Sequence, residues 1–299
     1  MVTVLINNYN YSKYLEDCIA SVTNQSFSDL QIIVVDDGST DNSPELIKSI
    51  SARDNRIIPI LKKNGGQASC FNAAYSQITG EYVFFLDSDD EFQPHYIDTG
   101  VEFYLKHTNC DFLFCALKHI GLRSRTSRKY PHVKHFGDTQ ALACILPTSI
   151  SSITSVISMK KNVYDMLYPF PFEEDWVYRV DECLHLGSSL AGATKCYMPD
   201  VLVNYRVHHE SHHINRLGSM DSTDAINRFV EHYMNKFSIT EQDLSRLVME
   251  GIRTSPSLDR DDVYLYRKAI MNAGIPTFSR VMCIIMLGRR YIETSVLKI

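Results

Sequence analysis

Short apolar runs alternate with helix-like segments through the first 120 residues. Runs of β-branched and aromatic residues, each of strand length, occur at 2–6, 30–35, 57–61 and 82–86. Between them, apolar residues recur every three or four positions, as in Leu15, Ile19 and Val22, and Ser12 stands where a helix cap is expected. Strands that are apolar throughout are typical of a parallel sheet covered by helices on both faces. We therefore predict an α/β fold.

The pattern changes beyond residue 120. Residues 121–135 combine basic and hydroxyl side chains without an acid and are predicted to form a loop. A strand is expected at 153–159, a helix opening at Glu173, and a late strand at 201–207. From about Ser219 the pattern is helical, with breaks near Pro256 and Pro276. We divide the chain into a domain of residues 1–215 and a helical C-terminal region of residues 216–299.

Charge and composition exclude several classes of protein. The formal net charge of -5 argues against general nucleic-acid binding, which needs a basic surface. No run of about 18 apolar residues is present, so no spanning helix is expected. The N-terminus has no signal-peptide pattern. The eight cysteines lack paired C-x-x-C spacing, which disfavours a zinc site and fits a cytoplasmic setting.

Two acidic clusters follow predicted strands. Asp36-Asp37 ends the second strand, and Asp87-Ser88-Asp89-Asp90 ends the fourth. In parallel sheets, ligands bind beyond the carboxyl ends of the strands. An isolated D-x-D is most simply a solvated turn, but here it faces a second acidic pair. That context favours a site for Mg²⁺ or Mn²⁺, whose open positions accept phosphate oxygens.

The remaining polar positions each have a structural and a chemical interpretation. Ser39 or Asp41 fits a cap of the next helix, with Gly38 in a turn, while neighbouring carboxylates remain able to accept hydrogen bonds from a nucleobase or a ribose. The acids at 173–175 suit a helix N-terminus whether or not they react. His208-His209 fits an exposed loop. Beside a metal, a carboxylate from 173–175 is a candidate general base and a histidine a candidate metal ligand.

These segments together resemble the family 2 glycosyltransferases. The stretch "SVTNQSFSDLQIIVVDDGSTDNS" (21–43) is similar to the most recognisable block of that family, and "NGGQASCFNAAYSQITGEYVFFLDSDD" (64–90) to its second block. The segments "EEDWVYRVDECLHLG" (173–187) and "NYRVHHES" (204–211) resemble its acidic catalytic and histidine motifs. The resemblance covers roughly residues 1–210. It implies a GT-A type, Rossmann-like, mostly parallel sheet flanked by helices.

The resemblance also implies an inverting transferase that uses a nucleotide diphosphate sugar, by family frequency a UDP-sugar. It assigns residues 1–120 to donor binding and 121–215 to the acceptor and catalysis. Asp175 matches the general base, preceded by Glu174, and Asp89 and His208 match metal-binding positions. The positions that correspond to donor binding are Asn8, Tyr9, Asp36, Asp37, Asn64, Gly65, Asn72, Asp87 and Ser88. The implied acceptor is a hydroxyl of a glycan or a lipid-linked saccharide.

The sequence departs from the family pattern at three points, and these limit what can be expected of the donor site and of the reaction. Asn7-Asn8 replaces a common Pro-Thr or Pro-Ser, and Phe71 replaces a basic residue before Asn72, so Lys62, Lys63 or the basic loop is expected to supply positive charge. No Q-x-x-R-W segment follows the acidic motif, which disfavours processive synthesis. Arg123, Arg125 and Arg128 are candidates for an anionic acceptor, with a solvated loop as the alternative.

Two questions stay open at the level of sequence. The apolar stretch 281–287 followed by Arg289-Arg290 suits peripheral contact with the inner face of the cell membrane, a partner helix as in a homodimer, or packing on its own domain. Two other functions compete with transfer. A D-x-D phosphotransferase is disfavoured by Glu91, which stands where that chemistry uses Thr or Val. An inactive sugar-nucleotide binding module would keep the metal site and lack a working base.

Overall fold

The structure, a computed structural model, describes residues 1–146, 153–177, 179–209, 222–256 and 258–296. The strands are β1 (Val2–Asn8), β2 (Leu30–Asp36), β3 (Ile57–Leu61), β4 (Tyr82–Asp87), β5 (Glu91–Phe92), β6 (Phe112–Gly121), β7 (Arg125–Ser127), β8 (Lys134–Asp138), β9 (Ile157–Lys160) and β10 (Thr194–Val207). The helices are α1 (Ser12–Thr23), α2 (Ser43–Ser51), α3 (Gln67–Ala74), α4 (Tyr96–Lys106), α5 (Gln140–Ile145), α6 (Lys161–Leu167), α7 (Val180–Leu190), α8 (Ser222–Lys236), α9 (Leu244–Thr254), α10 (Arg260–Asn272) and α11 (Thr277–Val296).

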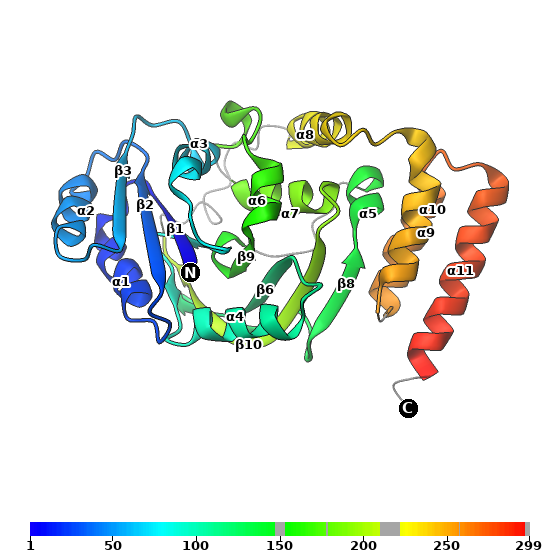
Figure 1. Cartoon of the computed structure of the whole chain (residues 1–299), viewed down its shortest axis with the longest axis horizontal. Helices are drawn as coiled ribbons and strands as arrows, with labels where there is room; N and C mark the ends of the chain where they lie inside the picture. Colours follow the sequence, from blue (N-terminus) through cyan, green and yellow to red (C-terminus); the bar gives the residue numbers. More distant parts are fainter. Residues whose placement is uncertain (147–152, 178, 210–221, 257, 297–299) are drawn as a thin grey trace.

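All ten strands join one sheet in the order β3-β2-β1-β4-β9-β6-β10-β5, with β7 beside β6 and β8 beside β10. The first four strands of that order run parallel, as do β6 and β10. Strand β9 is antiparallel to β4 and to β6, and so joins the two parallel parts. The sheet curls across the molecule with helices on its faces (Figure 1). The predicted α/β, mostly parallel architecture is confirmed.

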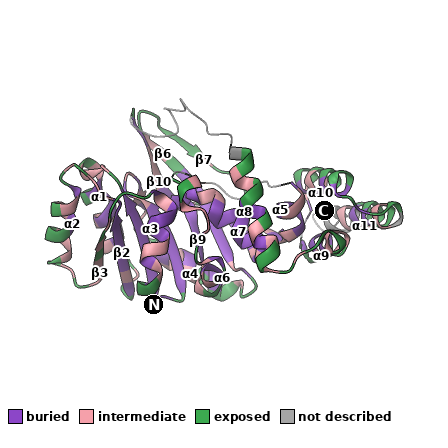
Figure 2. Ribbon diagram, turned by 90° about the horizontal axis from the view of Figure 1, so that it is seen from above, coloured by how far each residue is buried: buried purple, intermediate pink, exposed green. Residues whose placement is uncertain are grey.

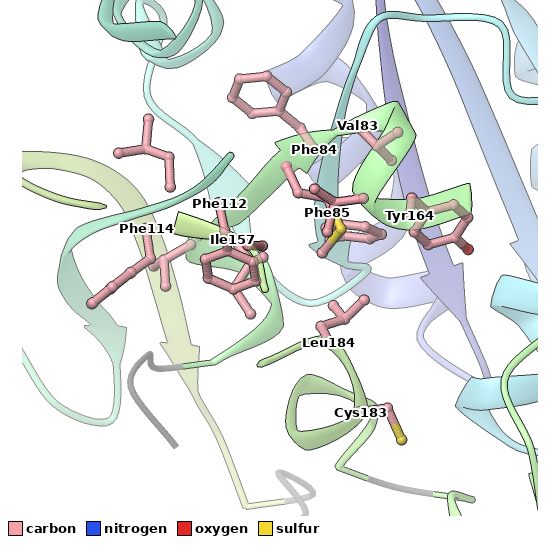
Figure 3. Close-up of a cluster of buried hydrophobic side chains, with 14 of the residues drawn as sticks. Val83, Phe84, Phe85, Phe112, Phe114, Ile157, Tyr164, Cys183 and Leu184 are labelled. Atoms are coloured by element: carbon pink, nitrogen blue, oxygen red, sulfur yellow. The ribbon is translucent and has the colours of Figure 1, made fainter. Parts of the chain in front are cut away.

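Alternating side chains of β4 show how the two faces are covered. Phe84 packs edge-on against Tyr96 of α4, with ring centroids 5.2 Å apart. Its neighbour Phe85 points to the opposite face, where it meets Phe71 of α3 at 5.3 Å and Tyr164 of α6 at 5.7 Å. Figure 3 shows Phe85 beside Tyr164, with Phe84 on the other side of the strand. Because both faces of β4 are buried, its sequence is apolar without alternation.

The C-terminal helices extend the molecule away from β3. Helix α8 packs on α7, and α9, α10 and α11 pack on one another at the far end (Figures 1 and 2). The predicted breaks near Pro256 and Pro276 separate these three helices. The expected boundary at residue 215 lies outside the described residues. None of the helices in the described ranges is both long and apolar enough to cross a bilayer.

The prediction of a loop at 121–135 was wrong in part. Gly121, with φ of 84°, turns the chain so that β7 pairs antiparallel with β6. Strand β7 is mostly exposed, so its residues are polar and carry no alternating signal. Strand β8 begins at Lys134, which is buried and paired with Asp259 and with Asp262 (2.9 Å). Because the strand begins with a buried charged residue, the pattern of apolar residues did not indicate where it starts.

The prediction of a helix opening at Glu173 was also wrong. Residues 173–175 form a single 3₁₀ turn, and α7 begins only at Val180. Phe172 and Arg179 both adopt left-handed backbone conformations, with φ of 56° and 66°, and these interrupt a helix on either side. Trp176 is buried, but from the connecting segment and not from a helix face. The acidic residues consequently stand on an irregular segment.

Three boundaries also differ from those predicted. The strand expected at 153–159 is a 3₁₀ turn followed by β9, and β10 begins at Thr194, well before 201. Ser12 starts α1 but does not cap it. Instead, Asp41 accepts a hydrogen bond from the Ser12 backbone N–H (2.9 Å) and another from that of Ser43 (3.0 Å). Asp41 thus satisfies the N-termini of two helices, one of which is remote in sequence.

Candidate active site

The ends of three adjacent strands bring the predicted polar residues to one edge of the sheet. In the register of the sheet, Asn8 at the end of β1 lies opposite Asp36 of β2, and Asn7 lies opposite Asp87 of β4. Parallel pairing forces this arrangement, because parallel strands all end at the same edge. The acidic pair at 36–37 and the acidic turn at 87–90 therefore flank the end of β1.

Asp36 organises the turn after β2. Its Oδ1 accepts hydrogen bonds from Asn8 Nδ2 (2.7 Å) and Ser39 Oγ (2.6 Å), and its Oδ2 accepts one from the Ser39 backbone N–H (2.9 Å). Asp36 is 1% exposed. Ser39 is bonded to Asp36 and to the Asn10 backbone N–H (2.8 Å), so it does not cap α2. Tyr9, next to this network, is exposed at the surface.

Asp37 anchors the glycine-rich loop that precedes α3. Its carboxylate accepts hydrogen bonds from the backbone N–H groups of Gly65 (2.9 Å) and Gly66 (2.8 Å) and from Asn64 Nδ2 (3.2 Å). Lys62 Nζ lies 2.5 Å from Asp37 Oδ1. Lys62, one of the residues expected to supply positive charge, therefore lies near the predicted donor-binding residues and forms an ion pair with Asp37.

Asp87 and Asp90 of the acidic turn are both in surroundings that disfavour a charged carboxylate. Asp90 points into the protein, where it accepts bonds from Ser155 Oγ (2.5 Å) and the Arg206 backbone N–H (2.8 Å). Burial, with Asp89 and Asp87 nearby, raises the pKa of Asp90 well above its usual range. Burial, Asp89 and Asp181 raise the pKa of Asp87 to about 8. Desolvation is the largest cause of both pKa shifts, and the negative charges of the neighbouring carboxylates add to it.

Asp89 and His208, the two residues predicted to bind the metal, lie in direct contact. His208 Nε2 lies 3.0 Å from Asp89 Oδ2, and both side chains are largely buried. The rings of Tyr11 and Tyr14 pack against the His208 ring, with centroids 5.4 and 4.9 Å away. Arg206 Nε donates to the Asp89 backbone carbonyl (2.9 Å). The end of β10 is therefore fastened to the acidic turn, although the two are more than 100 residues apart.

The donor set fits a cation bound partly by its substrate. Within the described ranges, no three His, Cys, Asp or Glu side chains are grouped closely enough to hold a metal on their own. Mg²⁺ and similar ions commonly take one or two protein ligands and complete their coordination with substrate phosphates and water. Asp89 and His208 meet that requirement. The buried Ser88 Oγ and Asn8 Oδ1 have no hydrogen-bond partner among the described residues, which leaves polar atoms available to a ligand.

The three residues of the acidic segment, residues 173–175, each lie in a different environment. Glu173 accepts a hydrogen bond from Asn72 Nδ2 (2.5 Å), and Asn72 Oδ1 accepts one from the Phe170 backbone N–H (2.8 Å). Asn72 thus fastens the segment to α3. Glu174 is exposed. The side chain of Asp175 is 5% exposed and forms an ion pair with Arg228 of α8.

Gly66 and Gln67, at the start of α3, connect the acidic segment to the strand ends. The backbone N–H of Gln67 donates to the Val177 carbonyl (3.1 Å), and its side chain reaches Asp87 Oδ1 (3.4 Å). Gly66, with φ of 86°, approaches so closely that a Cβ there would stand 2.5 Å from Val177 Cα. The Gly-Gly pair was a visible signal for this close approach. Nothing in the sequence marked Gln67 or Arg228.

The candidate acceptor arginines belong to a hairpin whose base, at Gly121, pairs with Val207 at the end of β10. Arg123, Arg125 and Arg128 are exposed on the hairpin formed by β6 and β7, which projects from the sheet in Figure 2. Arg128 Nε donates to the Pro199 carbonyl (3.0 Å). Among the described residues, no hydrogen bond or ion pair joins these arginines to the carboxylates of the site. His209, the other histidine of the pair, is exposed beside His208.

A family model and a relative from another organism match this chain. The model described as glycosyl transferase family 2 matches residues 3–163, more than half of the chain. An uncharacterized glycosyltransferase of Nostoc sp. is 28% identical over 249 residues, which cover 80% of this chain and 76% of the relative.

Two solved structures share the fold. One is a crystal structure of S. aureus TarS 1–349 in complex with UDP-GlcNAc (TM-score 0.64, 16% identity, covering 97% of this chain and 89% of that one). The other is a mannosyltransferase from Pyrobaculum calidifontis in complex with GDP-Man and Mn²⁺ (TM-score 0.54, 14% identity, covering 99% and 75%). At these identities the likeness concerns the GT-A type fold alone.

Proposed function

The chain belongs to glycosyltransferase family 2, and from this premise we propose that it transfers a sugar from a nucleotide diphosphate sugar, a UDP-sugar, to a hydroxyl group with inversion at the anomeric carbon. The acceptor in this proposal is a glycan or a lipid-linked saccharide, and transfer is non-processive. The observation that carries the proposal is the meeting of two acidic clusters and His208 at the carboxyl edge of adjacent parallel strands.

The nucleoside end of the donor is assigned to the turn after β2. Asp36 and Asp37, with Asn8 and Tyr9 from the end of β1, would form the pocket for base and ribose. Asn64 and Gly65 are fixed by Asp37, so they would shape the wall of this pocket through a loop that is already ordered. Asn72 supports the donor site indirectly in this proposal, because both of its amide atoms hold the segment at 170–173.

The diphosphate is assigned to the acidic turn. Asp89 and His208 would hold Mn²⁺ or Mg²⁺, with Asp87 and Ser88 close to the ribose or the metal. The cation would offset the negative charge that develops on the departing diphosphate. The raised pKa of Asp87 supports this assignment, because an unbalanced group of buried carboxylates is a favourable place for a cation.

Asp175 is the proposed general base, with Glu174 beside it. Its carboxylate would take the proton of the acceptor hydroxyl as the oxygen attacks the anomeric carbon from the side opposite the leaving diphosphate. The C–O bond to the acceptor forms as the C–O bond to the diphosphate breaks, which inverts the configuration. A general base of this kind contributes about 10²–10⁴-fold, so positioning and electrostatic stabilisation supply the rest.

The test combines donor binding with turnover. A panel of UDP- and GDP-sugars is scored by thermal stabilisation with and without Mn²⁺, since a ligand that binds only the folded state raises its stability. We expect metal-dependent stabilisation by one UDP-sugar, and its loss in Asp89→Asn. Asp175→Asn should keep that stabilisation and lose transfer by about 10²-fold or more. Undiminished transfer by Asp175→Asn would refute Asp175 as the base, whereas donor binding without any transfer by the wild type would favour an inactive binding module.

We also propose that the C-terminal helices rest on an anionic membrane surface at the inner face of the cell membrane. Cys283 and Leu287 of α11 are buried, while Val281, Ile284 and Ile285 on its other side are 45–58% exposed. A helix that is apolar on both sides normally has both sides covered.

Charge favours acidic lipid over a second copy of the chain. Residues 260–291 contain six Lys and Arg against two acids, although the whole chain is negative. Four of these basic side chains, Arg260, Arg267, Lys268 and Arg289, are exposed. The exposed apolar side chains of α11 and the exposed basic side chains of α10 and α11 suit an anionic bilayer surface, whereas two copies of a basic surface would repel each other.

A further inference from the structure

Helix α8 lies along the acidic segment and packs against it through aromatic residues. Phe229 and Tyr233, both fully buried, face the sheet domain. The Phe229 ring meets the Trp176 ring at 5.3 Å, and the Tyr233 hydroxyl donates to the Leu167 carbonyl. The segment that carries Asp175 therefore has α3 on one side, through Asn72 and Gln67, and α8 on the other.

A row of basic side chains on α8 follows the same segment. Arg228, His232 and Lys236 recur every four residues and so lie on one side of the helix. Arg228 pairs with Asp175, the His232 ring meets the Phe172 ring at 5.8 Å, and Lys236 Nζ donates to the Tyr168 carbonyl (3.1 Å). The contacts run from Asp175 back to residue 168 in order along the helix.

The Arg228–Asp175 pair is unlike an ordinary surface ion pair. The Asp175 side chain is 5% exposed, whereas that of Arg228 is 52% exposed, so a carboxylate that is shielded from water depends on a partner that reaches in from outside. The guanidinium of Arg228 also lies 5.2 Å from the centre of the Phe172 ring, which steadies its orientation. Among the described residues, Arg228 makes the one hydrogen bond found to this carboxylate, and it goes to Oδ2.

From this geometry we infer that Arg228 is a positioning residue for the general base. It holds Oδ2 of Asp175 and thereby directs Oδ1 toward the acceptor hydroxyl. The planar guanidinium fixes a carboxylate better than an ammonium does, because it donates in a defined direction. Helix α8 belongs to the catalytic site on this inference, although it comes from the C-terminal region. The inference rests on the proposed function, since it takes Asp175 as the base.

The test compares Arg228→Gln with a matched control, Arg246→Gln. Arg246 forms an exposed ion pair with Asp243 at the start of α9, remote from the site. Rates are expressed per folded enzyme, titrated by UDP binding. We expect Arg228→Gln to lower kcat by about 10-fold or more with an unchanged KM for the donor, because misplacing a catalytic group costs up to about 10²-fold. Arg228→Lys should recover part of the loss, and Arg246→Gln should match the wild type.

A double variant separates positioning from a general structural role. In the Asp175→Asn background, Arg228→Gln should cause no further loss, because the group that it positions is already disabled. An equal further loss there, or a kcat for Arg228→Gln equal to that of the control, would overturn the inference. If Asp175→Asn itself is fully active, the proposed base fails and the inference fails with it. If Asp175→Asn is inactive while Arg228→Gln has a normal kcat, the inference about Arg228 fails and the proposed base stands.

Discussion

Asp36 and Asp87 end the two strands that flank β1, Asp37 follows Asp36, and each carboxylate meets a different set of partners. Asp36 and Asp37 accept several hydrogen bonds each and hold turns in place. Asp87 has a long contact to Gln67 and lies near other acids, and its pKa is raised to about 8. The first two residues therefore have a structural role in addition to any contact with a ligand, while Asp87 carries an energetic cost that a bound cation would remove.

Asp181 gives a prediction at this scale. Burial, followed by Glu182, raises its pKa to about 6. The pKa in the unfolded chain is near 4, so folding disfavours the ionised carboxylate. This penalty is fully present above pH 6, shrinks as the pH falls, and is absent below pH 4. Asp181→Asn should raise the free energy of unfolding at pH 7.5 by on the order of 1–3 kcal/mol, and by less at pH 5.

The measurement is urea unfolding of the metal-free protein at both pH values. Asp261→Asn is the control, since Asp261 is an exposed acid in the first turn of α10 and its loss removes a similar helix-dipole interaction. A destabilised Asp181→Asn at pH 7.5 would mean that the carboxylate is held by favourable contacts and contradict the raised pKa.

At the scale of elements, the acidic segment and the β6–β7 hairpin both departed from the expected secondary structure. Both lie where tertiary contacts replace local regularity. Residues 168–177 are held by α3 and α8, and β7 is held by its pairing with β6. Polar segments of this kind have weak periodicity, so their conformation depends on which neighbours they meet.

The hairpin provides the prediction about the acceptor. Neutralising Arg123, Arg125 and Arg128 together to Gln should raise the apparent KM for an anionic acceptor several-fold and leave the donor KM unchanged, because exposed cations attract the acceptor without touching the donor pocket. Steady-state kinetics at low and at physiological ionic strength measure this, and the effect should be larger at low salt.

A control variant removes the same charge elsewhere. Arg53, Arg246 and Arg253 are exposed arginines outside the hairpin, and their replacement by Gln changes the net charge equally. An acceptor KM that rises as much in this control would show that only overall charge matters. An unchanged acceptor KM in the hairpin variant would remove the hairpin from the acceptor site.

At the scale of the whole molecule, the sheet domain and the α9–α11 group occupy opposite ends (Figure 1). The outer side of α11 is apolar and exposed, at the end farthest from β3. An exposed apolar surface of this kind is rare on a monomer without a partner. Membrane contact at that end would bring a lipid-linked acceptor near the enzyme while the donor approaches from water.

Flotation with liposomes tests the membrane proposal. The protein should float with vesicles containing phosphatidylglycerol, should float much less with phosphatidylcholine alone, and should be released by high salt. Ile284→Ser with Ile285→Ser should weaken binding, because two apolar side chains no longer enter the interface. Leu105→Ser, at an exposed leucine of α4 that is 68% exposed, is the control.

One outcome would contradict the membrane proposal and favour a dimer. If the wild type ignores anionic vesicles but forms a dimer in light scattering, and the double serine variant is a monomer, α11 serves contact between copies. That result would overturn the membrane proposal and leave the proposed transferase activity untouched.

The sequence by itself determined the strands of the donor half, the acidic residues at their ends and the family. Buried parallel strands must be apolar along their whole length, and the turns that follow them must carry the chemistry, so both leave local patterns that can be read directly. Asp36 and Asp89 were visible in this way, whereas Asp175 and His208 were singled out through the resemblance to the family.

Only the tertiary structure decided how those residues are held. The contact of His208 with Asp89, the capping of α1 by Asp41 and the pairing of Arg228 with Asp175 all join residues distant along the chain. Such contacts depend on side chains meeting in space, and one polar residue among many gives no periodic signal of its partner. The lone arginine on α8 became informative once folding had placed it against a shielded carboxylate.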